Sequence, residues 1–414
     1  MTGRPRPARA VAAASVLVLV ALALLTGCAS GSDPSDARPG QRPRTGGPVD
    51  ERSGDTSGTI PSGTVPVDGR PTQLDPGAGL LIGTPVYDGD FADPYVLIDD
   101  GTNYVYATNT DDANLPVIVS AGGDEGTYHG DAFPTLPSWT TPGFVWAPAV
   151  YARGDGYIAY YTTADTASKR QCVSRAVAPS PVGPFVDDSS GPLVCQSDLG
   201  GTIDPSVVAD VDGRSWLLFK NDGNCCDLTT SLWSQELSPD GLEVVGQPTR
   251  LIDADQAWEG GLIEAPSMVI ADGTAYLFYS ANAWDSANYA VGYARCDSVT
   301  GPCTKADGPW MTSTAFAKGP GGQEFFAKDG VVWMVYHGWE RGQIGYPQGQ
   351  RRLYLDIVRV ADGTPARVGE ETARVAIALA IGAVVAVVVG LVVVVVARRR
   401  RRAAILAGSV TRSR

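Results

Sequence analysis

A pattern of two short strands joined by a turn occurs five times in this chain of 414 residues, and it restricts the fold more than any other feature. The first copy is "DPYVLIDDGTNYVYATN", which begins at Asp93. The other copies begin at Ala147, Asp204, Ala265 and Gln323, so consecutive starts lie 54 to 61 residues apart. Each copy consists of an apolar strand, a turn containing Asp or Gly, and an aromatic-rich strand.

The regular spacing predicts an all-β domain. No part of the repeated region shows helical periodicity, and further strand-like runs such as "LPVIVSA" and "YAVGYARC" lie between the copies. A unit of several short strands, with no helix to cover its sheets, is typical of a β-propeller blade. Five copies therefore predict a five-bladed β-propeller over residues 76–365. A two-sheet sandwich is the alternative, but it does not explain the constant spacing.

The N-terminal region has the features of an export signal. A basic start is followed by an apolar run that ends in Leu-Thr-Gly-Cys at Cys28. This predicts a lipoprotein signal peptide over residues 1–27, with Cys28 as the lipidated N-terminus of the mature protein; a plain secretory signal is the alternative. Residues 28–75 are rich in Gly, Ser, Pro and Asp, which predicts a flexible, disordered tether before the propeller.

The C-terminal region contains an apolar run. Residues 375–397 carry no charge over 23 positions, which is long enough to cross the hydrocarbon layer. The basic cluster Arg398–Arg402 follows directly and marks the cytoplasmic side, so a transmembrane helix is favoured over a buried core helix. Residues 398–414 are then a basic cytoplasmic tail. The propeller is expected outside the cell membrane, anchored to it.

Cysteine content and charge agree with export. Within the predicted domain the cysteines are Cys172, Cys195, Cys225, Cys226, Cys296 and Cys303. An even number in an exported domain favours disulfides, and sequence order predicts Cys172 with Cys195 and Cys296 with Cys303, leaving the adjacent pair as a possible vicinal bridge. A zinc site is the competing interpretation, but the chain has two histidines and no Cys-x-x-Cys. The net charge of −13 argues against nucleic acid as a partner.

Acidic residues open three of the five copies. In a propeller the first strand of each blade lines the central channel, so Asp93, Asp204 and Glu264 are expected to meet at one mouth of it. Like charges in one pocket raise one another's pKa, which can keep one carboxyl protonated near neutral pH. Hydrolysis of a glycosidic bond needs such an acid and a second carboxylate. For any one of these residues, a turn aspartate or a surface charge is the alternative.

The motifs "FADPYV", "WAPAV", "TIDPSV" and "IEAPSM", in this order and spacing, resemble those of glycoside hydrolase family 43. The resemblance covers about residues 80–362. It implies a five-bladed propeller that acts on arabinan, arabinoxylan or xylan with inversion. It also implies that Asp93 is the general base, that Glu264 is the general acid, and that Asp204 orients the acid and tunes its pKa.

Two further residues are candidates for the pocket. Trp146 either packs or forms an apolar wall for the sugar ring. A core histidine is one interpretation of His337, but the resemblance implies that it holds a water-coordinated ion in the channel, for which calcium is the first choice. Just upstream, "GPGGQEFF" departs from the Gly-His-Asn of many relatives, so the polar contacts of the fifth blade are expected to differ. For Arg351 and Arg352 a structural role is favoured over one in the channel.

The expected function is that of a membrane-tethered, exo-acting α-L-arabinofuranosidase or arabinanase. A β-xylosidase is the alternative within the same enzyme class. The alternative from another class is a non-catalytic carbohydrate-binding propeller. Such a module should have lost one of the three acids, and all three are present.

Overall fold

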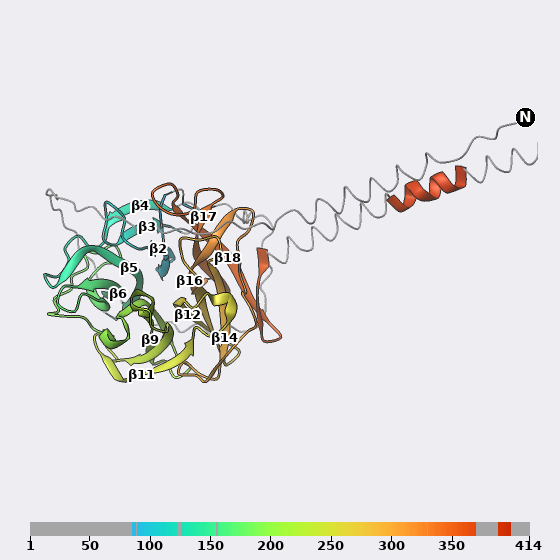
Figure 1. Cartoon of the computed structure of the whole chain (residues 1–414). Helices are drawn as coiled ribbons and strands as arrows, with labels where there is room; N and C mark the ends of the chain where they lie inside the picture. Colours follow the sequence, from blue (N-terminus) through green and yellow to red (C-terminus); the bar gives the residue numbers. More distant parts are fainter. Residues whose placement is uncertain are drawn as a thin grey trace, which may run out of the picture. The chain divides into compact units, whose positions relative to one another are not determined.

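The computed structural model describes residues 85–369, apart from residues 88, 122–125, 155 and 329, and also residues 388–398. Within the first of these ranges the chain forms five antiparallel sheets. The sheets follow one another around a common centre, in the order of the sequence (Figure 1). Three single-turn 3-10 helices interrupt the strands: η1 (Ser197–Leu199), η2 (Gly223–Cys226) and η3 (Ala257–Glu259).

The strands of the five sheets have the following bounds. The first sheet contains β1 (Tyr95–Asp99), β2 (Thr102–Tyr106), β3 (Pro116–Ser120) and β4 (Thr127–Asp131). The second contains β5 (Thr140–Arg153), β6 (Gly156–Asp165) and β7 (Gln171–Ala178). The third contains β8 (Thr202–Ala209), β9 (Ser215–Asn221), β10 (Ser231–Leu237) and β11 (Val244–Asp253). The fourth contains β12 (Ile263–Ala271), β13 (Thr274–Ala281), β14 (Ala290–Cys296) and β15 (Cys303–Lys305). The fifth contains β16 (Ala317–Lys328), β17 (Val331–Glu340), β18 (Arg351–Ala361) and β19 (Thr364–Arg367).

The first strand of each sheet lies nearest the centre. β1 contacts β5, β5 contacts β8, β8 contacts β12, β12 contacts β16, and β16 returns to β1. Five first strands thus form a closed ring, and the remaining strands of each sheet follow outwards in chain order. This is a five-bladed β-propeller, as the spacing of the repeat predicted. A two-sheet sandwich is excluded, because it has no such ring.

The beginning and the end of the domain are joined by hydrogen bonds. The amide of Val86 donates to the carbonyl of Leu353 at 2.8 Å, and the amide of Phe91 donates to the carbonyl of Arg351 at 2.8 Å. Tyr87 and Leu353 form an antiparallel bridge. The segment that precedes the first blade therefore pairs with β18 of the last blade, and this pairing closes the ring.

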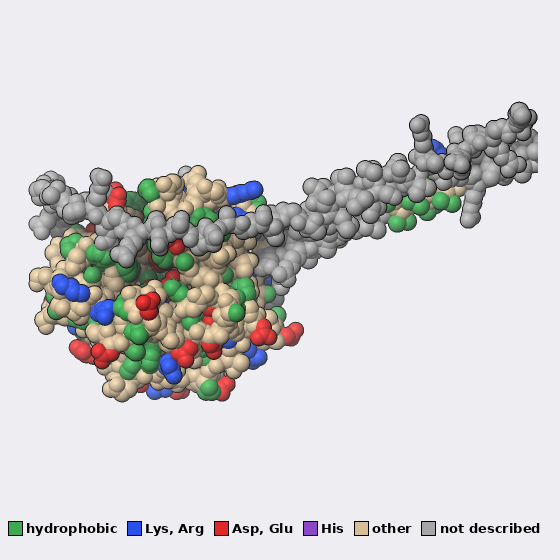
Figure 2. Space-filling view, viewed as in Figure 1, with side chains coloured by type: hydrophobic (Ala, Val, Ile, Leu, Met, Phe, Trp, Pro, Cys, Tyr) green, Lys and Arg blue, Asp and Glu red, His purple; other side chains and the backbone are tan. Residues whose placement is uncertain are grey.

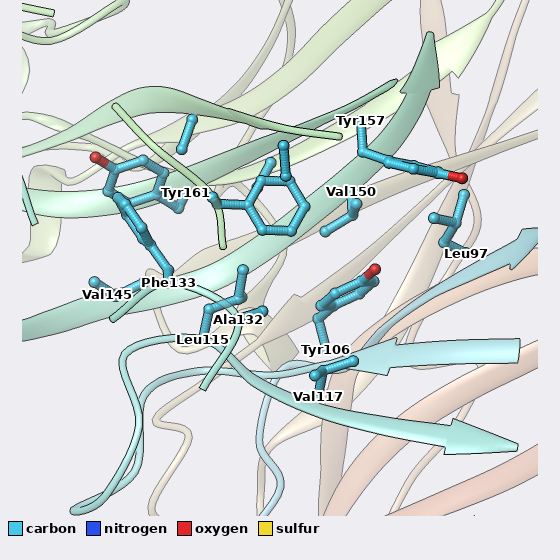
Figure 3. Close-up of a cluster of buried hydrophobic side chains, with 14 residues drawn as sticks. Leu97, Tyr106, Leu115, Val117, Ala132, Phe133, Val145, Val150, Tyr157 and Tyr161 are labelled. Atoms are coloured by element: carbon cyan, nitrogen blue, oxygen red, sulfur yellow. The ribbon is translucent and has the colours of Figure 1, made fainter. Parts of the chain in front are cut away.

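Aromatic side chains fill the space between neighbouring blades. Figure 3 shows the cluster between the first and second blades, where Tyr106 from β2 lies near Tyr157 and Val150 from the second blade. Phe133 and Tyr161 meet edge to face, with ring centroids 5.0 Å apart. Each such ring removes roughly 150–250 Å² from water, so the blades are held together mainly by apolar contact.

The buried tyrosine hydroxyls in this cluster have partners. Tyr106 donates to the carbonyl of Pro181 at 2.5 Å, and Tyr161 donates to Asp187 at 2.7 Å. A buried hydroxyl without a partner would cost free energy, so these bonds let the aromatic side chains serve as core residues.

The predicted disulfide pairs are confirmed. Cys172 in β7 bonds to Cys195, and Cys296 bonds to Cys303 between β14 and β15. The adjacent residues Cys225 and Cys226 form the vicinal bridge, within η2. All six cysteines of the domain are thus paired, and the zinc interpretation is wrong for them.

The predicted signal peptide (residues 1–27) and the predicted tether (residues 28–75) lie outside the described residues, as do residues 76–84 of the predicted domain and residues 375–387 of the predicted membrane span. Residues 388–398 are helical, and their apolar side chains, such as Val388 and Leu391, are exposed. Among the described residues, no helix has the length and apolar character needed to cross a membrane.

Candidate active site

One backbone position is left-handed in all five inner strands. The φ angles are 49° at Asp93, 41° at Ala147, 56° at Asp204, 49° at Ala265 and 55° at Gly322. Four of these residues are not glycine, and each left-handed residue of that kind costs on the order of 1–3 kcal/mol. The strain recurs at equivalent places around the ring. This places Asp93 and Asp204 at one end of the propeller, with Glu264 one residue before its blade's left-handed position.

Hydrogen bonds between blades hold four of these positions. The amide of the left-handed residue donates to a side chain near the end of the second strand of the preceding blade. The pairs are Ala147 to Thr108 Oγ1 at 3.0 Å, Asp204 to Thr162 Oγ1 at 3.0 Å, Gly322 to Ser280 Oγ at 2.9 Å, and Asp93 to His337 Nδ1 at 3.1 Å. The fifth position differs, because the amide of Ala265 donates to Asp204 Oδ2 at 2.9 Å.

Asp93 is held in its ionised form. Its Oδ2 accepts a hydrogen bond from Thr108 at 2.7 Å and lies 3.1 Å from the guanidinium of Arg351. Burial acts to raise the pKa of Asp93, but Arg351, His337 and Thr108 together hold it well below its usual range. A carboxylate in this setting stays ionised at any pH at which the protein is expected to work.

Arg351 corrects the structural role favoured from the sequence. Its side chain reaches into the site, where it contacts Asp93 and stacks over Trp284, with the guanidinium carbon 4.8 Å from the ring centroid. Arg352, the next residue, points to the other face of β18 and pairs with Glu340 at 3.2 Å. Alternation along a strand explains the difference, because neighbouring side chains face opposite sides of the sheet.

Glu264 lies between a cation and a phenol. Its Oε2 is 3.0 Å from the ammonium of Lys220, and its Oε1 accepts a hydrogen bond from Tyr289 at 2.8 Å. The side chain of Lys220 is fully buried, and Tyr289 is 1% exposed. The two contacts replace the water that burial removes from the carboxyl oxygens of Glu264, and they fix the orientation of its side chain.

Asp204 holds the proton of this group. Burial and the nearby Glu264 carboxylate raise the pKa of Asp204 to about 8, against the opposing effect of Lys220. Near neutral pH the carboxyl of Asp204 therefore keeps its proton. The site thus combines an ionised carboxylate, Asp93, with a carboxyl that holds a proton, Asp204.

His337 lies beside Asp93, as far from solvent as any residue in the domain. Its side chain is fully buried, its Nδ1 lies 3.3 Å from Asp93 Oδ1, and its ring stacks on Tyr289. Burial lowers the pKa of His337, so the imidazole is neutral. Its Nε2 is buried and has no hydrogen-bond partner among the described residues.

The surroundings of His337 fit a metal ion under one condition. While Nδ1 accepts the amide of Asp93, the proton of the neutral ring is on Nε2, which then cannot bind a metal. Only in the other tautomer, in which Nδ1 donates to Asp93 Oδ1, has Nε2 a free lone pair, and carboxylate–histidine pairs of that kind commonly orient a metal ligand. In the described part of the chain no three His, Cys, Asp or Glu side chains are grouped to bind a metal. An ion at Nε2 would thus take most of its ligands from water, which suits calcium except for the nitrogen ligand.

Trp146 stands at the position equivalent to Glu264, one residue before the left-handed residue of its own blade. It is half-buried, and its ring lies 5.7 Å from that of Phe144. The next residue, Ala147, bonds to Thr108, which in turn bonds to Asp93. Trp146 is thus linked to Asp93 through Ala147 and Thr108, and part of its surface remains exposed to a ligand.

Sequence reasoning missed Lys220 and Tyr289. Lys220 reads as the end of an ordinary strand, and Tyr289 lies in a loop between two strands. A signal for Lys220 exists in the repeat, since Thr108, Thr162, Ser280 and His337 occupy the equivalent positions in the other copies. A lysine at this position departs from the pattern, and it indicates that the third blade supplies a cation to the carboxyl that opens the fourth, Glu264.

The glycines of "GPGGQEFF" also have a specific role. A Cβ at Gly322 would lie 2.6 Å from Asp93 Oδ1, and one at Gly321 would lie 2.1 Å from the ring of Tyr289. Gln323 is buried and joins two blades, accepting from Ser280 at 2.8 Å and donating to the carbonyl of Ala265 at 2.8 Å. The departure from the usual motif therefore brings the fifth blade close to Asp93 and to Tyr289, the partner of Glu264.

A five-bladed propeller with three carboxyl groups at one end of its ring, of which Asp93 is ionised and Asp204 holds a proton, is the arrangement of a propeller glycosidase. Comparison with known proteins identifies the family. The model of the glycosyl hydrolases family 43 matches residues 82–365, and the chain belongs to this family. It is a family 43 glycoside hydrolase, as the motifs indicated.

Characterised relatives and solved structures agree with this assignment. A beta-D-galactofuranosidase of Aspergillus niger is 26% identical over 276 residues, which cover 62% of this chain and 76% of the relative. Extracellular endo-alpha-(1->5)-L-arabinanase 1 of Bacillus subtilis is 26% identical over 295 residues, covering 66% and 86%. The crystal structure of a thermostable family-43 glycoside hydrolase aligns with a TM-score of 0.61 and 26% identity, covering 67% of this chain and 93% of that one.

Proposed function

We propose that the protein hydrolyses arabinose-containing polysaccharides or oligosaccharides, as an exo-acting α-L-arabinofuranosidase or arabinanase that inverts the anomeric centre. The observation that carries this proposal is the unequal state of the carboxyl groups at this mouth, with an ionised Asp93 and, beside Glu264, a protonated Asp204. Inverting hydrolysis needs one base and one acid at the same time.

In the proposed reaction Asp93 takes a proton from a water molecule as the water attacks the anomeric carbon. Glu264, in its protonated form, gives its proton to the leaving oxygen, so the glycosidic bond breaks as the new bond forms on the opposite face. Asp204 orients and tunes this acid, and Lys220 and Tyr289 keep the side chain of Glu264 in one orientation. Trp146 is assigned to the wall of the sugar pocket.

The substrate class is supported by the relatives. Their names include arabinanases that act on alpha-(1->5) linkages, and an exo-alpha-(1->5)-L-arabinofuranosidase of Cellvibrio japonicus is 25% identical over 273 residues. The Aspergillus relative favours a galactofuranoside as the second candidate. A β-xyloside remains the third, supported by the structural similarity to an endo-1,4-beta-xylanase of Bacteroides thetaiotaomicron, with a TM-score of 0.59 and 27% identity.

The purified protein should be tested against aryl α-L-arabinofuranoside, aryl β-D-galactofuranoside, aryl β-D-xyloside and linear arabinan. We expect the arabinofuranoside to be hydrolysed fastest, and arabinan to release mainly arabinose. Proton NMR of the first product should show the inverted anomer. Retention of configuration, or no hydrolysis of any of the four substrates, would overturn the proposal.

The role of Glu264 has its own test. Glu264→Gln should lower kcat by roughly 10²–10⁴-fold on substrates with alkoxide leaving groups, the usual contribution of a general acid. Aryl glycosides with acidic phenols should lose much less, because a phenolate leaves with little protonation. The measurement is kcat on both substrate types, with circular dichroism as the control for folding. Equal losses on the two types would contradict the assignment.

We also propose that His337 Nε2 holds an ion, with calcium as the first choice and water as its other ligands. The support is the buried, unpartnered nitrogen beside Asp93. Elemental analysis of the purified protein tests this directly, and His337→Ala should lose the metal. Equal metal content in the two proteins would contradict the proposal.

For location we propose that the propeller works outside the cell, tethered to the membrane by the lipidated Cys28 and by residues 375–397. The support is in the sequence, where an export signal and a basic cluster after the apolar run predict the same topology. Intact cells should be treated with a protease that cannot cross the membrane, and the hydrolase activity should then be measured. Loss of the activity is expected, and full retention would contradict the proposal.

A further inference from the structure

The vicinal disulfide lies on the loop that leaves β9, at the end of the propeller that carries the carboxyl groups. Asn221 at the end of β9 pairs with Thr202 at the start of β8, two residues before Asp204. The loop then forms η2 (Gly223–Cys226) and turns back into β10. It therefore borders the same mouth of the channel as the candidate active site.

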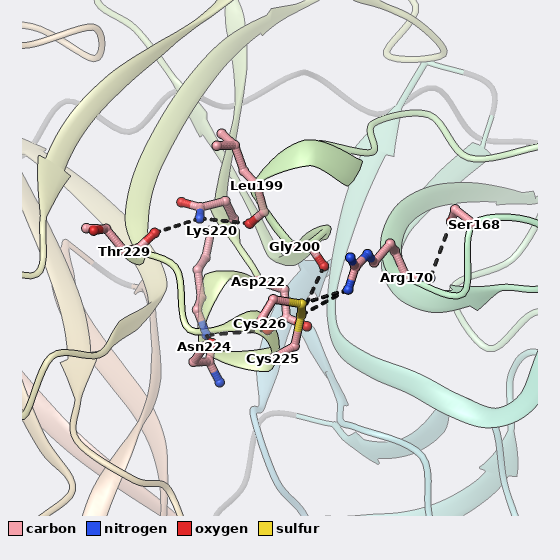
Figure 4. Close-up of a disulfide and its surroundings, with 11 residues drawn as sticks. Ser168, Arg170, Leu199, Gly200, Lys220, Asp222, Asn224, Cys225, Cys226 and Thr229 are labelled. Atoms are coloured by element: carbon pink, nitrogen blue, oxygen red, sulfur yellow. Dashed lines mark hydrogen bonds and ion pairs between the residues drawn. A yellow bond between two sulfur atoms is a disulfide. The ribbon is translucent and has the colours of Figure 1, made fainter.

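A single ammonium joins this loop to the candidate acid. Lys220 Nζ lies 3.0 Å from Glu264 Oε2 and donates to Asn224 Oδ1 at 2.7 Å (Figure 4). Lys220 is fully buried, whereas Asn224 is exposed. The loop thus begins where the buried site meets solvent, and only one side chain separates it from Glu264.

The loop is held in one shape. The side-chain Nδ2 of Asn221 donates to the carbonyls of Leu199 at 3.1 Å and of Thr229 at 2.9 Å. A Cβ at Gly223 would lie 2.7 Å from the carbonyl oxygen of Thr229, so the turn requires glycine. Arg170, from the second blade, reaches the bridge and lies 2.7 Å from Cys226 Sγ. A surface fixed in advance loses little conformational entropy when it binds a ligand.

The exposed side of the loop has the chemistry that suits a sugar ring. Cys225 is exposed, and Leu228 and Leu199 retain 43% and 38% of their exposure, so sulfur and methyl groups form an apolar ledge. The amide nitrogen of Asn224 and the guanidinium of Arg170 offer donors beside it. A sugar likewise presents C–H groups on one face and hydroxyls at its edge.

We propose that Asn224–Leu228, with Arg170, forms the binding site for the sugar on the leaving-group side of the scissile bond. A general acid must face the oxygen that it protonates, and the sugar attached to that oxygen must lie against the wall nearest Glu264. Two walls contact Glu264. Tyr289 from one of them is 1% exposed, whereas the loop joined to Glu264 through Lys220 reaches solvent at Asn224 and can meet a sugar. The inference rests on the proposed glycosidase function, and its ligand is a furanose or pentose residue of the substrate chain.

The test compares two substrates with the same reacting sugar. One is the oligosaccharide, whose leaving group is a sugar, and the other is the aryl glycoside. Cys225→Ser/Cys226→Ser should lower kcat/KM on the oligosaccharide about tenfold, which is about 1.4 kcal/mol of lost binding. On the aryl glycoside it should change kcat/KM less than about threefold. The matched control is Cys296→Ser/Cys303→Ser, which removes a disulfide near the opposite end of its blade, where Cys296 pairs with Ala275.

The outcomes separate this proposal from the proposed function. If the wild type hydrolyses neither substrate, the function is wrong. If it hydrolyses both and the variant keeps the wild-type ratio of the two kcat/KM values, the leaving-group site is overturned. Should the serine variant fail to fold, Leu228→Ser leaves the disulfide intact and removes part of the ledge. An unchanged ratio in that variant also overturns the site.

Discussion

Lys220 is the residue that distinguishes the third blade from the other four. The equivalent residues are Thr108, Thr162, Ser280 and His337, and each accepts the amide of the next blade's left-handed residue. An ammonium has no lone pair to accept with. The amide of Ala265 bonds to Asp204 instead, and Lys220 pairs with Glu264. One change in the repeat thereby frees the amide of Ala265 to hold Asp204 and gives Glu264 a cation as its partner.

Removing this cation should move the pH profile. In Lys220→Met the site loses the cation that opposes the raised pKa of Asp204, so that pKa rises further and the proton of Asp204 is lost at higher pH. The alkaline limb of the kcat/KM profile should shift upwards, and kcat should fall about 10- to 100-fold because Glu264 loses an anchor. The control is Lys305→Met, which removes another largely buried lysine, paired with Glu259 at 2.6 Å. An alkaline limb at the wild-type position in Lys220→Met would refute this role.

Asp204 should also make stability depend on pH. Its pKa is about 8 in the folded protein and about 4 in an unfolded chain, so between these values the folded state binds more protons. The free energy of unfolding should therefore decrease as pH rises through this range. Asp204→Asn should flatten that decrease, and its amide oxygen can still accept from Ala265. Urea unfolding at pH 5 and pH 8 measures the difference; identical slopes for the two proteins would contradict the prediction.

Part of the pH dependence should survive in that variant. Glu324 lies in β16 and accepts hydrogen bonds from Ser206 at 2.8 Å and from Ser267. Burial raises the pKa of Glu324 to about 7. Because its pKa is also raised in the folded protein, Glu324 likewise makes the free energy of unfolding decrease as pH rises. Asp204→Asn should therefore reduce this decrease without abolishing it.

At the scale of the strands, the hydrogen bonds between blades fix where the carboxyls stand. Thr162→Val should test this, because it leaves the amide of Asp204 without its acceptor. An unpaired buried amide costs about 1–3 kcal/mol, and the effect on kcat should exceed the effect on KM, since a catalytic group is displaced. Thr163→Val is the matched control, because the buried hydroxyl of Thr163 has no partner among the described residues. Equal destabilisation by the two substitutions would count against the prediction.

The strands were predictable because each repeat carries its own local pattern. Alternating apolar residues and the turns between them determine β1 with β2 or β12 with β13, and the period places Asp93 and Asp204 at one mouth. The disulfides followed from sequence order. Each of these signals lies within one or two blades of the chain.

The contacts that complete the site were not predictable in the same way. Arg351 meets Asp93 across 258 residues of sequence, and His337 meets it across 244. Tyr289 reaches Glu264 from a loop whose shape depends on packing against the fifth blade. Such contacts depend on closure of the ring, which no local pattern encodes. Figure 2 shows that acidic and basic side chains are scattered over the visible face of the propeller. Their arrangement in space likewise follows from the closed fold and not from any local pattern.

At the scale of the whole molecule, the segment that closes the propeller ring, residues 85–91, also contacts the candidate active site. Asp90 Oδ1 accepts the amide of Arg351 at 2.6 Å, and Asp90 Oδ2 accepts the hydroxyl of Tyr346 at 2.7 Å. Phe91 is 1% exposed and packs edge to face with Tyr87 at 5.4 Å. The segment that closes the ring therefore also positions Arg351, which holds Asp93 in its ionised form.

Removing this segment should affect stability and catalysis together. A chain that begins at residue 92 loses Phe91 from the core, which by itself costs about 3–5 kcal/mol, and frees the main chain of Arg351. Without a fixed Arg351 the pKa of Asp93 rises, so the acid limb of the kcat/KM profile should move to higher pH. A chain that begins at residue 76 is the control, because it keeps the closing segment. The measurements are the urea midpoint and the pH profile of both chains. If the shorter chain keeps the midpoint and the acid limb of the longer one, closure by residues 85–91 does not position the base.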